Sequence, residues 1–113
     1  MAPSTAYGEP IRTEREKDTP TIQELINKYD WDIDIAYAVA QAESELLPTA
    51  YNPEWHNGCQ GSYGIMQIAC IHEEEPNKLF DAEYNIRRAF ELYEEQGWKP
   101  WGVCHDGKVQ CGL

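Results

Sequence analysis

Glu43 is the side chain of this sequence whose position best suits acid–base chemistry. It stands four residues after Val39 and eight after Ile35, at the edge of the apolar side of an expected helix. A carboxyl group held against apolar side chains favours its neutral form, so its pKa rises toward the value that a general acid needs near neutral pH. We therefore predict a general acid at Glu43, although most carboxylates on helices are simply solvated.

A second group of candidate residues lies in the segment 61–68, which reads GSYGIMQI. Its two glycines permit a tight turn and let a ligand approach the backbone closely. Ile65 and Met66, beside the amide of Gln67, would form an apolar wall with one hydrogen-bonding group, which suits an acetamido sugar. The alternative for Ile65 and Met66 is an ordinary place in the hydrophobic core.

These candidates depend on elements that hold them in place, and the spacing of apolar residues predicts helices over 21–29, 32–47 and 81–97. Each helix begins at a residue that can cap its first turn. Pro48 ends the second helix and Gly97 ends the third.

The remaining segments have other signatures. Residues 49–64 are rich in Asn, Pro and Gly, which predicts a loop or a short hairpin, and the apolar stretch 65–71 fits more than one kind of element. Residues 1–18 carry prolines and mixed charges without helical periodicity, so we expect a flexible N-terminal arm followed by one domain over 19–113. The architecture indicated is a small helical domain with a glycine-rich middle.

Length and charge narrow the classes of function. The 113 residues suffice for one compact domain, and 42% apolar with 26% charged residues is a globular composition. A net charge of −11 argues against nucleic acid as a partner, because phosphate binding needs a cationic surface. No apolar run reaches the ~20 residues of a membrane span, and the N-terminal residues MAPSTAYGEP show no secretion signal. We expect a monomer.

Four cysteines in so small a domain favour disulfides in an oxidising compartment. A metal site is the competing interpretation, because three histidines lie near the cysteines in the sequence. However, no C-x-x-C pair is present and the spacings match no common zinc site, so we predict disulfides and no metal. Three pairings are possible, and among them we favour short-range closure, Cys59 with Cys70 and Cys104 with Cys111.

Four motifs follow one another along the chain: A-x-x-E-S at 40–44, GSYGIMQI at 61–68, DAEYNI at 81–86 and QGWKPWGVC at 96–104. In this order and spacing they resemble the soluble lytic transglycosylase and goose-type lysozyme superfamily over residues 20–105. The last motif is also similar to the ends of resuscitation-promoting factor domains and of phage tail-associated muramidase domains. The resemblance implies a mainly α, lysozyme-like fold of the α+β type, in which the glycine-rich segment lines a sugar cleft.

The resemblance also implies an activity, the cleavage of the β-1,4 bond between N-acetylmuramic acid and N-acetylglucosamine in the glycan strands of peptidoglycan. Such an enzyme needs no cofactor, and it would be secreted, periplasmic or phage-associated. Glu43 matches the catalytic acid of the superfamily. The implied substrate-binding residues are Ser44, Ser62, Tyr63, Met66, Gln67, Asn85 and Trp101, while Trp98 is assigned to the core.

The sequence departs from this superfamily in two respects. Many transglycosylases carry a later A-Y-N-x-G segment whose Tyr touches the catalytic acid, whereas the AYN at 50–52 lies too early to be its counterpart. Many wall-cleaving enzymes are basic, but a net charge of −11 would repel an anionic wall at low salt. Binding would then rest on stacking and hydrogen bonds in the cleft.

A second carboxylate would decide between two reactions. A hydrolase normally pairs its acid with another carboxylate, about 5–5.5 Å away for retention or about 6.5–9.5 Å for inversion. A transglycosylase uses one carboxylate and forms a 1,6-anhydro product. Glu45 diverges from Glu43 on a helix, which leaves Glu54 as the possible second carboxylate. Nothing in the predicted loop holds Glu54, so the sequence slightly favours anhydro products and leaves both reactions open.

Two other classes of function remain open. A sugar-binding module could have kept the cleft and lost catalysis, although the intact pair of Glu43 and Ser44 argues against that reading. An inhibitor or interaction domain stapled by disulfides is supported only by the acidic charge.

Overall fold

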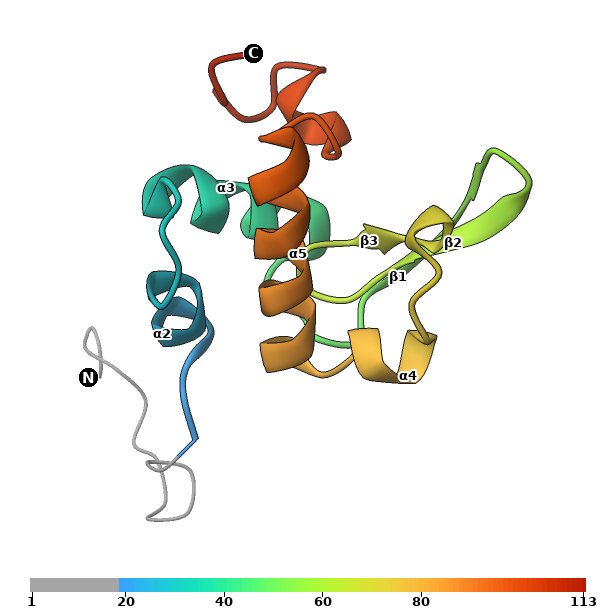
Figure 1. Cartoon of the computed structure of the whole chain (residues 1–113), viewed down its shortest axis with the longest axis horizontal. Coiled ribbons are helices and arrows are strands. Elements are labelled where there is room, and N and C mark those ends of the chain that lie inside the picture. Colours follow the sequence, from blue (N-terminus) through green and yellow to red (C-terminus); the bar gives the residue numbers. More distant parts are fainter. Residues whose placement is uncertain (1–18) are drawn as a thin grey trace.

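The computed structural model describes residues 19–113, and the expected N-terminal arm, 1–18, lies outside the described residues (Figure 1). The sequence of elements begins with two helices, continues through a small antiparallel sheet and ends with a long helix. In order they are α2 (Ile22–Asn27), α3 (Ile33–Ser44), β1 (Tyr51–His56), β2 (Cys59–Tyr63), β3 (Ile68–Ala69), the 3-10 helix η1 (Cys70–His72), α4 (Pro76–Leu79), α5 (Ala82–Gln96) and the 3-10 helix η2 (Gly102–Cys104). This arrangement confirms the expected α+β class.

The three helices expected from the sequence are present, and local side-chain caps begin each of them. Asp32 accepts a hydrogen bond from the backbone of Ile35 at 3.1 Å, and Asp81 caps α5 in the same way. Thr21 begins α2 with a capping box. These bonds satisfy backbone N–H groups that a first helical turn leaves without partners.

Helix α3 ends earlier than expected. Glu45 and Leu46 take left-handed backbone conformations, with φ of 55° and 64°, so the helix stops at Ser44 before Pro48 can end it. Its buried face therefore consists of Ala36, Val39, Ala40 and Ser44, and Ala42 is exposed. The early end matters for the site, because it places Glu43 in the last turn of the helix.

The middle of the chain forms a hairpin rather than an open loop, the second of the two expected alternatives. Strands β1 and β2 pair in antiparallel fashion, from Tyr51 opposite Tyr63 to His56 opposite Cys59, and β3 adds a short third strand beside β2. Asn57 and Gly58 connect β1 to β2 with positive φ angles of 44° and 99°, which is typical of tight hairpin turns. The apolar stretch 65–71 divides into a turn, β3 and the start of η1.

Helix α5 runs through the centre of the molecule, with α2 and α3 on one side and the sheet with α4 on the other (Figure 1). The side chains in the core that are almost fully buried come from all these parts: Ile26, Val39, Ile65, Met66, Ile68, Leu79, Ile86 and Leu92. An aromatic cluster extends the core toward the C-terminal end, where Trp98 stacks on Trp31 with ring centroids 5.7 Å apart. None of the helices in residues 19–113 has the length and apolar character that crossing a membrane requires.

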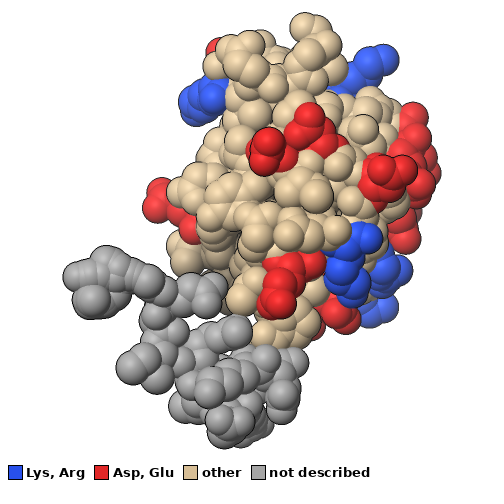
Figure 2. Space-filling view, turned by 90° about the vertical axis from the view of Figure 1, so that its left-hand side faces the viewer, with Lys and Arg blue, Asp and Glu red and all other residues tan. Residues whose placement is uncertain are grey.

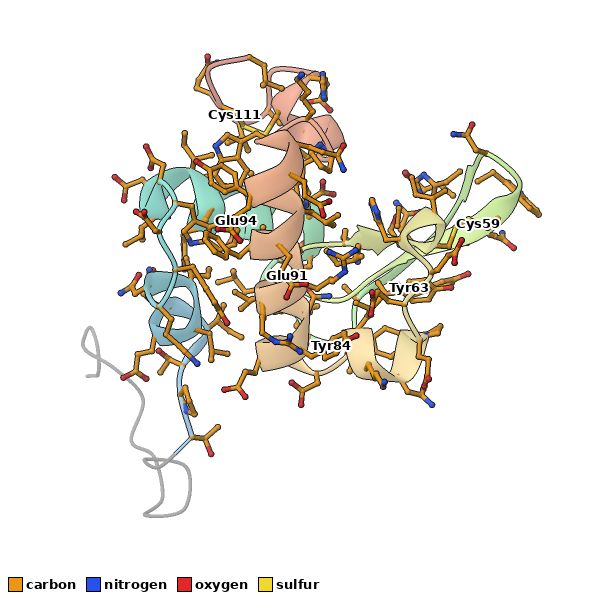
Figure 3. The ribbon with its side chains drawn as sticks, in the orientation of Figure 1. Cys59, Tyr63, Tyr84, Glu91, Glu94 and Cys111 are labelled. Atoms are coloured by element: carbon orange, nitrogen blue, oxygen red, sulfur yellow. A yellow bond between two sulfur atoms is a disulfide. The ribbon has the colours of Figure 1, made fainter. Side chains whose placement is uncertain are left out.

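Two disulfides join the cysteines in the pairing expected from short-range closure. Cys59–Cys70 ties the start of β2 to η1, and Cys104–Cys111 closes the C-terminal segment onto η2. Figure 3 places Cys59 on the hairpin and Cys111 beyond the C-terminal end of α5. Within residues 19–113, no group of three or more His, Cys, Asp or Glu side chains is arranged to hold a metal ion.

Alkylation of the oxidised protein is expected to label no thiol, because all four cysteines are paired. Replacing Cys59 and Cys70 together by serine is expected to lower the free energy of unfolding by roughly 2–4 kcal/mol. Intact mass after non-reducing alkylation and urea unfolding of the variant measure these two effects. Two or more labels per chain, or zinc in elemental analysis, would contradict the pairing.

Candidate active site

A cleft of about 330 Å³ opens between the end of α3, the sheet and the segment that follows α5. Carboxylates, imidazoles and amides make up most of its wall. The lining residues are Glu43, Asn52, Glu54, His56, Ser62, Gln67, Ala69, Ile71, His72, Gln96, Pro100 and Gly102. Four of the site residues expected from the sequence, Glu43, Glu54, Ser62 and Gln67, thus share one cavity.

Glu43 occupies the last turn of α3 and is partly buried at the cleft wall. The pKa of its carboxyl group is raised to about 7, mainly by burial and in smaller part by the negative charges of Glu54 and Asp106, while Lys108 opposes the increase. Removal from water disfavours the charged form of the acid, and neighbouring carboxylates do the same through like-charge repulsion. A carboxyl group in this state holds a proton near neutral pH and can donate it.

Ser44 lies behind Glu43 in the core rather than on the cleft wall. Its side chain is 6% exposed, and its hydroxyl lies 2.8 Å from the carbonyl oxygen of Ile65 and 3.0 Å from that of Ala40. The contact with Ile65 joins the end of α3 to the glycine-rich segment. Ser44 therefore positions Glu43 against the cleft, and the hydroxyl is not directed at a ligand.

Asn85 lies on α5, and its side chain binds the backbone of the glycine-rich segment. It is fully buried, its amide oxygen accepts from the backbone N–H of Met66 at 2.8 Å, and its amide nitrogen donates to the carbonyl oxygens of Tyr63 and Leu79, both at 2.9 Å. These three hydrogen bonds join α5 to the end of β2, to the turn that follows it and to the end of α4. Expected from the sequence to border the cleft, Asn85 instead holds the cleft wall in shape.

Met66 and Trp101 also belong to the core. Met66 is fully buried, and Trp101, 2% exposed, donates from its indole nitrogen to the carbonyl oxygen of Met66 at 2.8 Å. This bond links the segment after α5 to the turn that carries Gln67. Gln67 does line the cleft, and its amide nitrogen donates to the carbonyl oxygens of Ala50 and Gly64.

Tyr63 faces away from the cleft because neighbouring residues of a strand point to opposite sides of the sheet. Ser62 lines the cleft, whereas the ring of Tyr63 packs on Tyr51, with centroids 5.2 Å apart, and on Phe80. Its hydroxyl donates to the carbonyl oxygen of Gln60 at 3.2 Å. Tyr63 is thus placed to stabilise the outer side of the sheet.

Gly64 is expected to tolerate no side chain, since a Cβ there would lie 2.2 Å from the Leu79 carbonyl oxygen and 2.3 Å from the Asn85 amide nitrogen. Gly64→Ala should lower the free energy of unfolding by roughly 3–5 kcal/mol through this overlap and its φ of 80°. Gly58→Ala is the matched control, because φ is also positive there but nothing lies within 4 Å. We expect roughly 1 kcal/mol for the control; equal losses in urea unfolding would contradict the close contact.

Glu54 lies on strand β1, in the hairpin that the sequence offered as the alternative to a loop. The amide nitrogen of Asn52 donates to one carboxylate oxygen of Glu54 at 2.9 Å, and the Nε2 atom of His56 lies 3.7 Å from the other. The three side chains line the cleft together. Glu54 is therefore a held carboxylate in the same cavity as Glu43, although its side chain is 57% exposed.

Asn52 and His56 are the cleft residues beside Glu54 that sequence reasoning missed. They stand two residues before and two residues after Glu54, and β1, whose register with β2 shifts between Asn52 and Trp55, brings all three side chains to the cleft. In a loop, the same spacing would not bring the three side chains together. The turn residues Asn57 and Gly58 were the available signal, because they favour a hairpin whose first strand contains this face.

Residues 28–103 match the family model described as "Lysozyme like domain". The chain belongs to the lysozyme-like domain family. Comparisons with curated proteins and with solved structures find no match. The matched range of this lysozyme-like domain contains all the residues that line the cleft, from Glu43 to Gly102.

The surface of the lysozyme-like domain reflects the net charge of −11 of the whole chain. Figure 2 shows several separate groups of acidic side chains on one face, without a continuous basic surface among the described residues there. Long-range attraction to an anionic polymer is therefore weak, and short-range contacts must supply the affinity for any such ligand.

Proposed function

We propose that this lysozyme-like domain is a muramidase that cleaves the β-1,4 bond between N-acetylmuramic acid and N-acetylglucosamine in peptidoglycan. The observation that carries the proposal is Glu43, a carboxyl group with a pKa of about 7 at the wall of a polar cleft. Membership of the lysozyme-like family supports a glycosidase acting on peptidoglycan. The resemblance of the pair Glu43 and Ser44 to the superfamily's motif supports the same role.

Glu43 donates its proton to the glycosidic oxygen as the bond between that oxygen and the anomeric carbon breaks. Water then forms the new bond to the anomeric carbon and gives up a proton, which Glu54 accepts in the proposed reaction. Solvent returns a proton to Glu43 and removes one from Glu54, so each cycle consumes one water. The negative charge of Glu54 contributes to the raised pKa of Glu43, and the two carboxylates line the same cleft.

Hydrolysis is the proposed reaction because Glu54 is held inside the cleft by Asn52 and stands beside His56. A transglycosylase would instead let the 6-hydroxyl of the muramic acid attack the anomeric carbon, and it would need only Glu43. The sequence slightly favoured that second reaction on the ground that Glu54 was unsupported. The contact of Glu54 with Asn52 and its place in the same cleft as Glu43 support the two-carboxylate reaction instead.

The partner of the domain in this proposal is a glycan strand of peptidoglycan, which a monomer binds without a cofactor. The protein would work outside the cytoplasm or as part of a phage particle, and the two disulfides are consistent with such an oxidising location. Its acidic charge implies that salt promotes binding to anionic walls, because screening weakens the repulsion.

Activity is expected to fall as pH rises above about 7, because the general acid must carry a proton and burial raises the pKa of Glu43 to about 7. Well above this value, kcat/KM should fall about tenfold per pH unit as the protonated fraction declines. Initial rates on purified peptidoglycan at constant ionic strength from pH 5 to 9 measure the effect. Activity that stays constant up to pH 9 would contradict a general acid with this pKa.

The proposed function is tested by the loss of turbidity of purified peptidoglycan on addition of the protein. A muramidase clears the suspension and releases soluble fragments, whereas a sugar-binding module sediments with the peptidoglycan and leaves the turbidity unchanged. An inhibitor or interaction domain neither binds nor clears it. Failure to release fragments from several peptidoglycan types would overturn the proposal.

A further inference from the structure

We propose that His56 is a positioning residue that, together with Ser62, holds the Glu54 carboxylate in place for the attack of water. The inference rests on the proposed muramidase function and assigns a role to a side chain that the reaction described above does not use. It predicts that His56 influences the choice between water and the muramic 6-hydroxyl, without touching the sugar itself.

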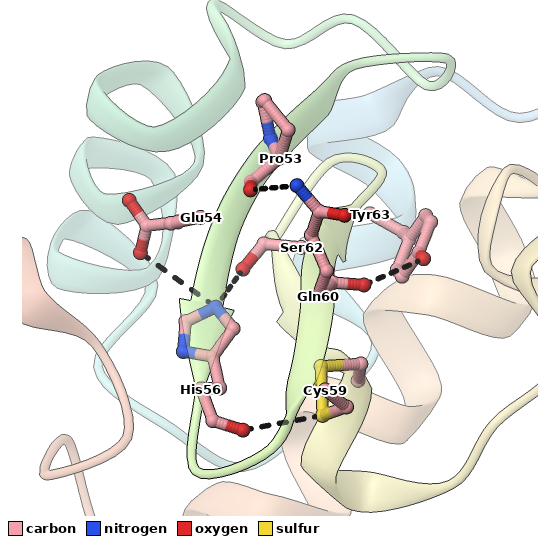
Figure 4. Close-up of a disulfide and its surroundings, with 8 residues drawn as sticks. Pro53, Glu54, His56, Cys59, Gln60, Ser62 and Tyr63 are labelled. Carbon is pink, nitrogen blue, oxygen red and sulfur yellow. Dashed lines mark hydrogen bonds and ion pairs between the residues drawn. A yellow bond between two sulfur atoms is a disulfide. The ribbon is translucent and has the colours of Figure 1, made fainter.

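The contacts of His56 lie within one small cluster on the hairpin (Figure 4). Its Nε2 atom is 2.9 Å from the hydroxyl oxygen of Ser62 and 3.7 Å from a carboxylate oxygen of Glu54. The other carboxylate oxygen accepts from Asn52 at 2.9 Å. Each oxygen of Glu54 therefore has one polar neighbour, which restricts a long side chain that would otherwise rotate freely in solvent.

The backbone beneath His56 is fixed at several points. His56 pairs with Cys59 across the end of the hairpin, and the Cys59–Cys70 disulfide joins that end to η1. Ser62, the partner of the ring, is 5% exposed on the paired strand. The side chain of His56 is 22% exposed, against 57% for Glu54, so the imidazole is the more buried of the two partners.

The chemistry of the ring suits this role. An imidazole Nε2 that carries a proton donates to the Ser62 oxygen and presents the same N–H edge to Glu54, and an Nε2 without a proton accepts from the Ser62 hydroxyl. In either state Ser62 fixes the plane of the ring. A protonated ring adds attraction for the carboxylate at 3.7 Å.

When Glu54 is held, it accepts a proton from the attacking water and the product carries a reducing end. When Glu54 is loosened, water loses its base, and the muramic 6-hydroxyl attacks the anomeric carbon instead, with its proton passing to the Glu43 carboxylate. The product then has a 1,6-anhydro end. The ratio of anhydro to reducing ends therefore reports the position of Glu54, and it does not depend on how much of a variant is folded.

The experiment measures this ratio by mass spectrometry of muropeptides released from purified peptidoglycan. His56→Ala is expected to raise the ratio about tenfold or more, as the contribution of a positioned base is reduced. His56→Gln, which keeps an N–H near the position of Nε2, should stay within about twofold of the parent. His105→Ala removes an exposed histidine that does not line the cleft and whose Nε2 atom contacts the carbonyl oxygen of Lys99, and it should leave the ratio unchanged.

A double variant tests whether His56 acts through Glu54. Adding His56→Ala to Glu54→Gln should not change the ratio further, because residues that act as one unit are not additive. The inference is overturned if His56→Ala keeps the parental ratio, if the alanine and glutamine variants shift it equally, or if the double variant shifts it beyond Glu54→Gln. A parent protein that releases no muropeptide would instead overturn the proposed function, and the inference with it.

Discussion

Glu43→Gln is expected to lower the rate of peptidoglycan clearance by about 10²–10⁴-fold, because the amide keeps the shape of the side chain and cannot donate a proton. Glu43 is the carboxyl group of the cleft whose pKa burial raises to about 7. The variant should still sediment with peptidoglycan, since the rest of the cleft wall is unchanged. Clearance at more than a tenth of the parental rate would exclude Glu43 as the acid.

The free energy of unfolding of Glu43→Gln shows whether the variant loses activity through its chemistry or through a change in structure. The folded-state pKa of Glu43, about 7, lies above the ordinary value of 4.5 for this carboxyl group in an unfolded chain, so the unfolded chain releases this proton first as pH rises. The stability linked to the protonated form is fully present below pH 4.5 and is lost by about pH 7. Gln does not titrate, so Glu43→Gln should match the parent near pH 4 and be more stable at pH 8, by about 1–3 kcal/mol after allowance for solvent screening.

Glu54→Gln is expected to lower the production of reducing ends by about 10²-fold or more and to leave 1,6-anhydro ends as the main product. The amide can keep a contact with Asn52 or His56, but it cannot accept a proton from water. Glu43 remains able to protonate the leaving oxygen, so cleavage continues by the internal attack. Quantitative mass spectrometry of both kinds of end measures the effect.

Glu45→Gln is the matched control for that experiment, because Glu45 is an exposed carboxylate two residues from Glu43 and does not line the cleft. It removes the same charge from the same region, and it should change neither the rate nor the products. If Glu54→Gln keeps full activity with unchanged products, the reaction uses Glu43 as its one carboxylate.

The helices were predictable because their signals are local. Asp32 and Asp81 cap helices through bonds to residues three positions away, and the apolar spacing identifies the buried sides. Strand β1 gave no such signal, since five of its six residues are exposed and a proline interrupts the pattern. The pairing with β2 and the turn at 57–58 create this strand, and pairing is a property of the folded chain.

The position of Glu43 at the cleft could be predicted, because its helix sets its surroundings. The roles of Ser44 and Asn85 could not be predicted in the same way. A short polar side chain near a cleft can bind a ligand or satisfy a backbone group, and only the folded structure reveals which. In both residues the hydrogen bonds go to the backbone of the glycine-rich segment, which explains why they accompany Glu43 in the motifs.

Mass spectrometry of peptidoglycan digested by the parent protein tests the central claim most directly. In the proposed muramidase reaction Glu43 and Glu54 act with water as the acceptor, so the new ends should be reducing N-acetylmuramic acid residues. The anhydro product is lighter by one water and is easily distinguished. New ends on N-acetylglucosamine, or 1,6-anhydro ends alone, would contradict the account.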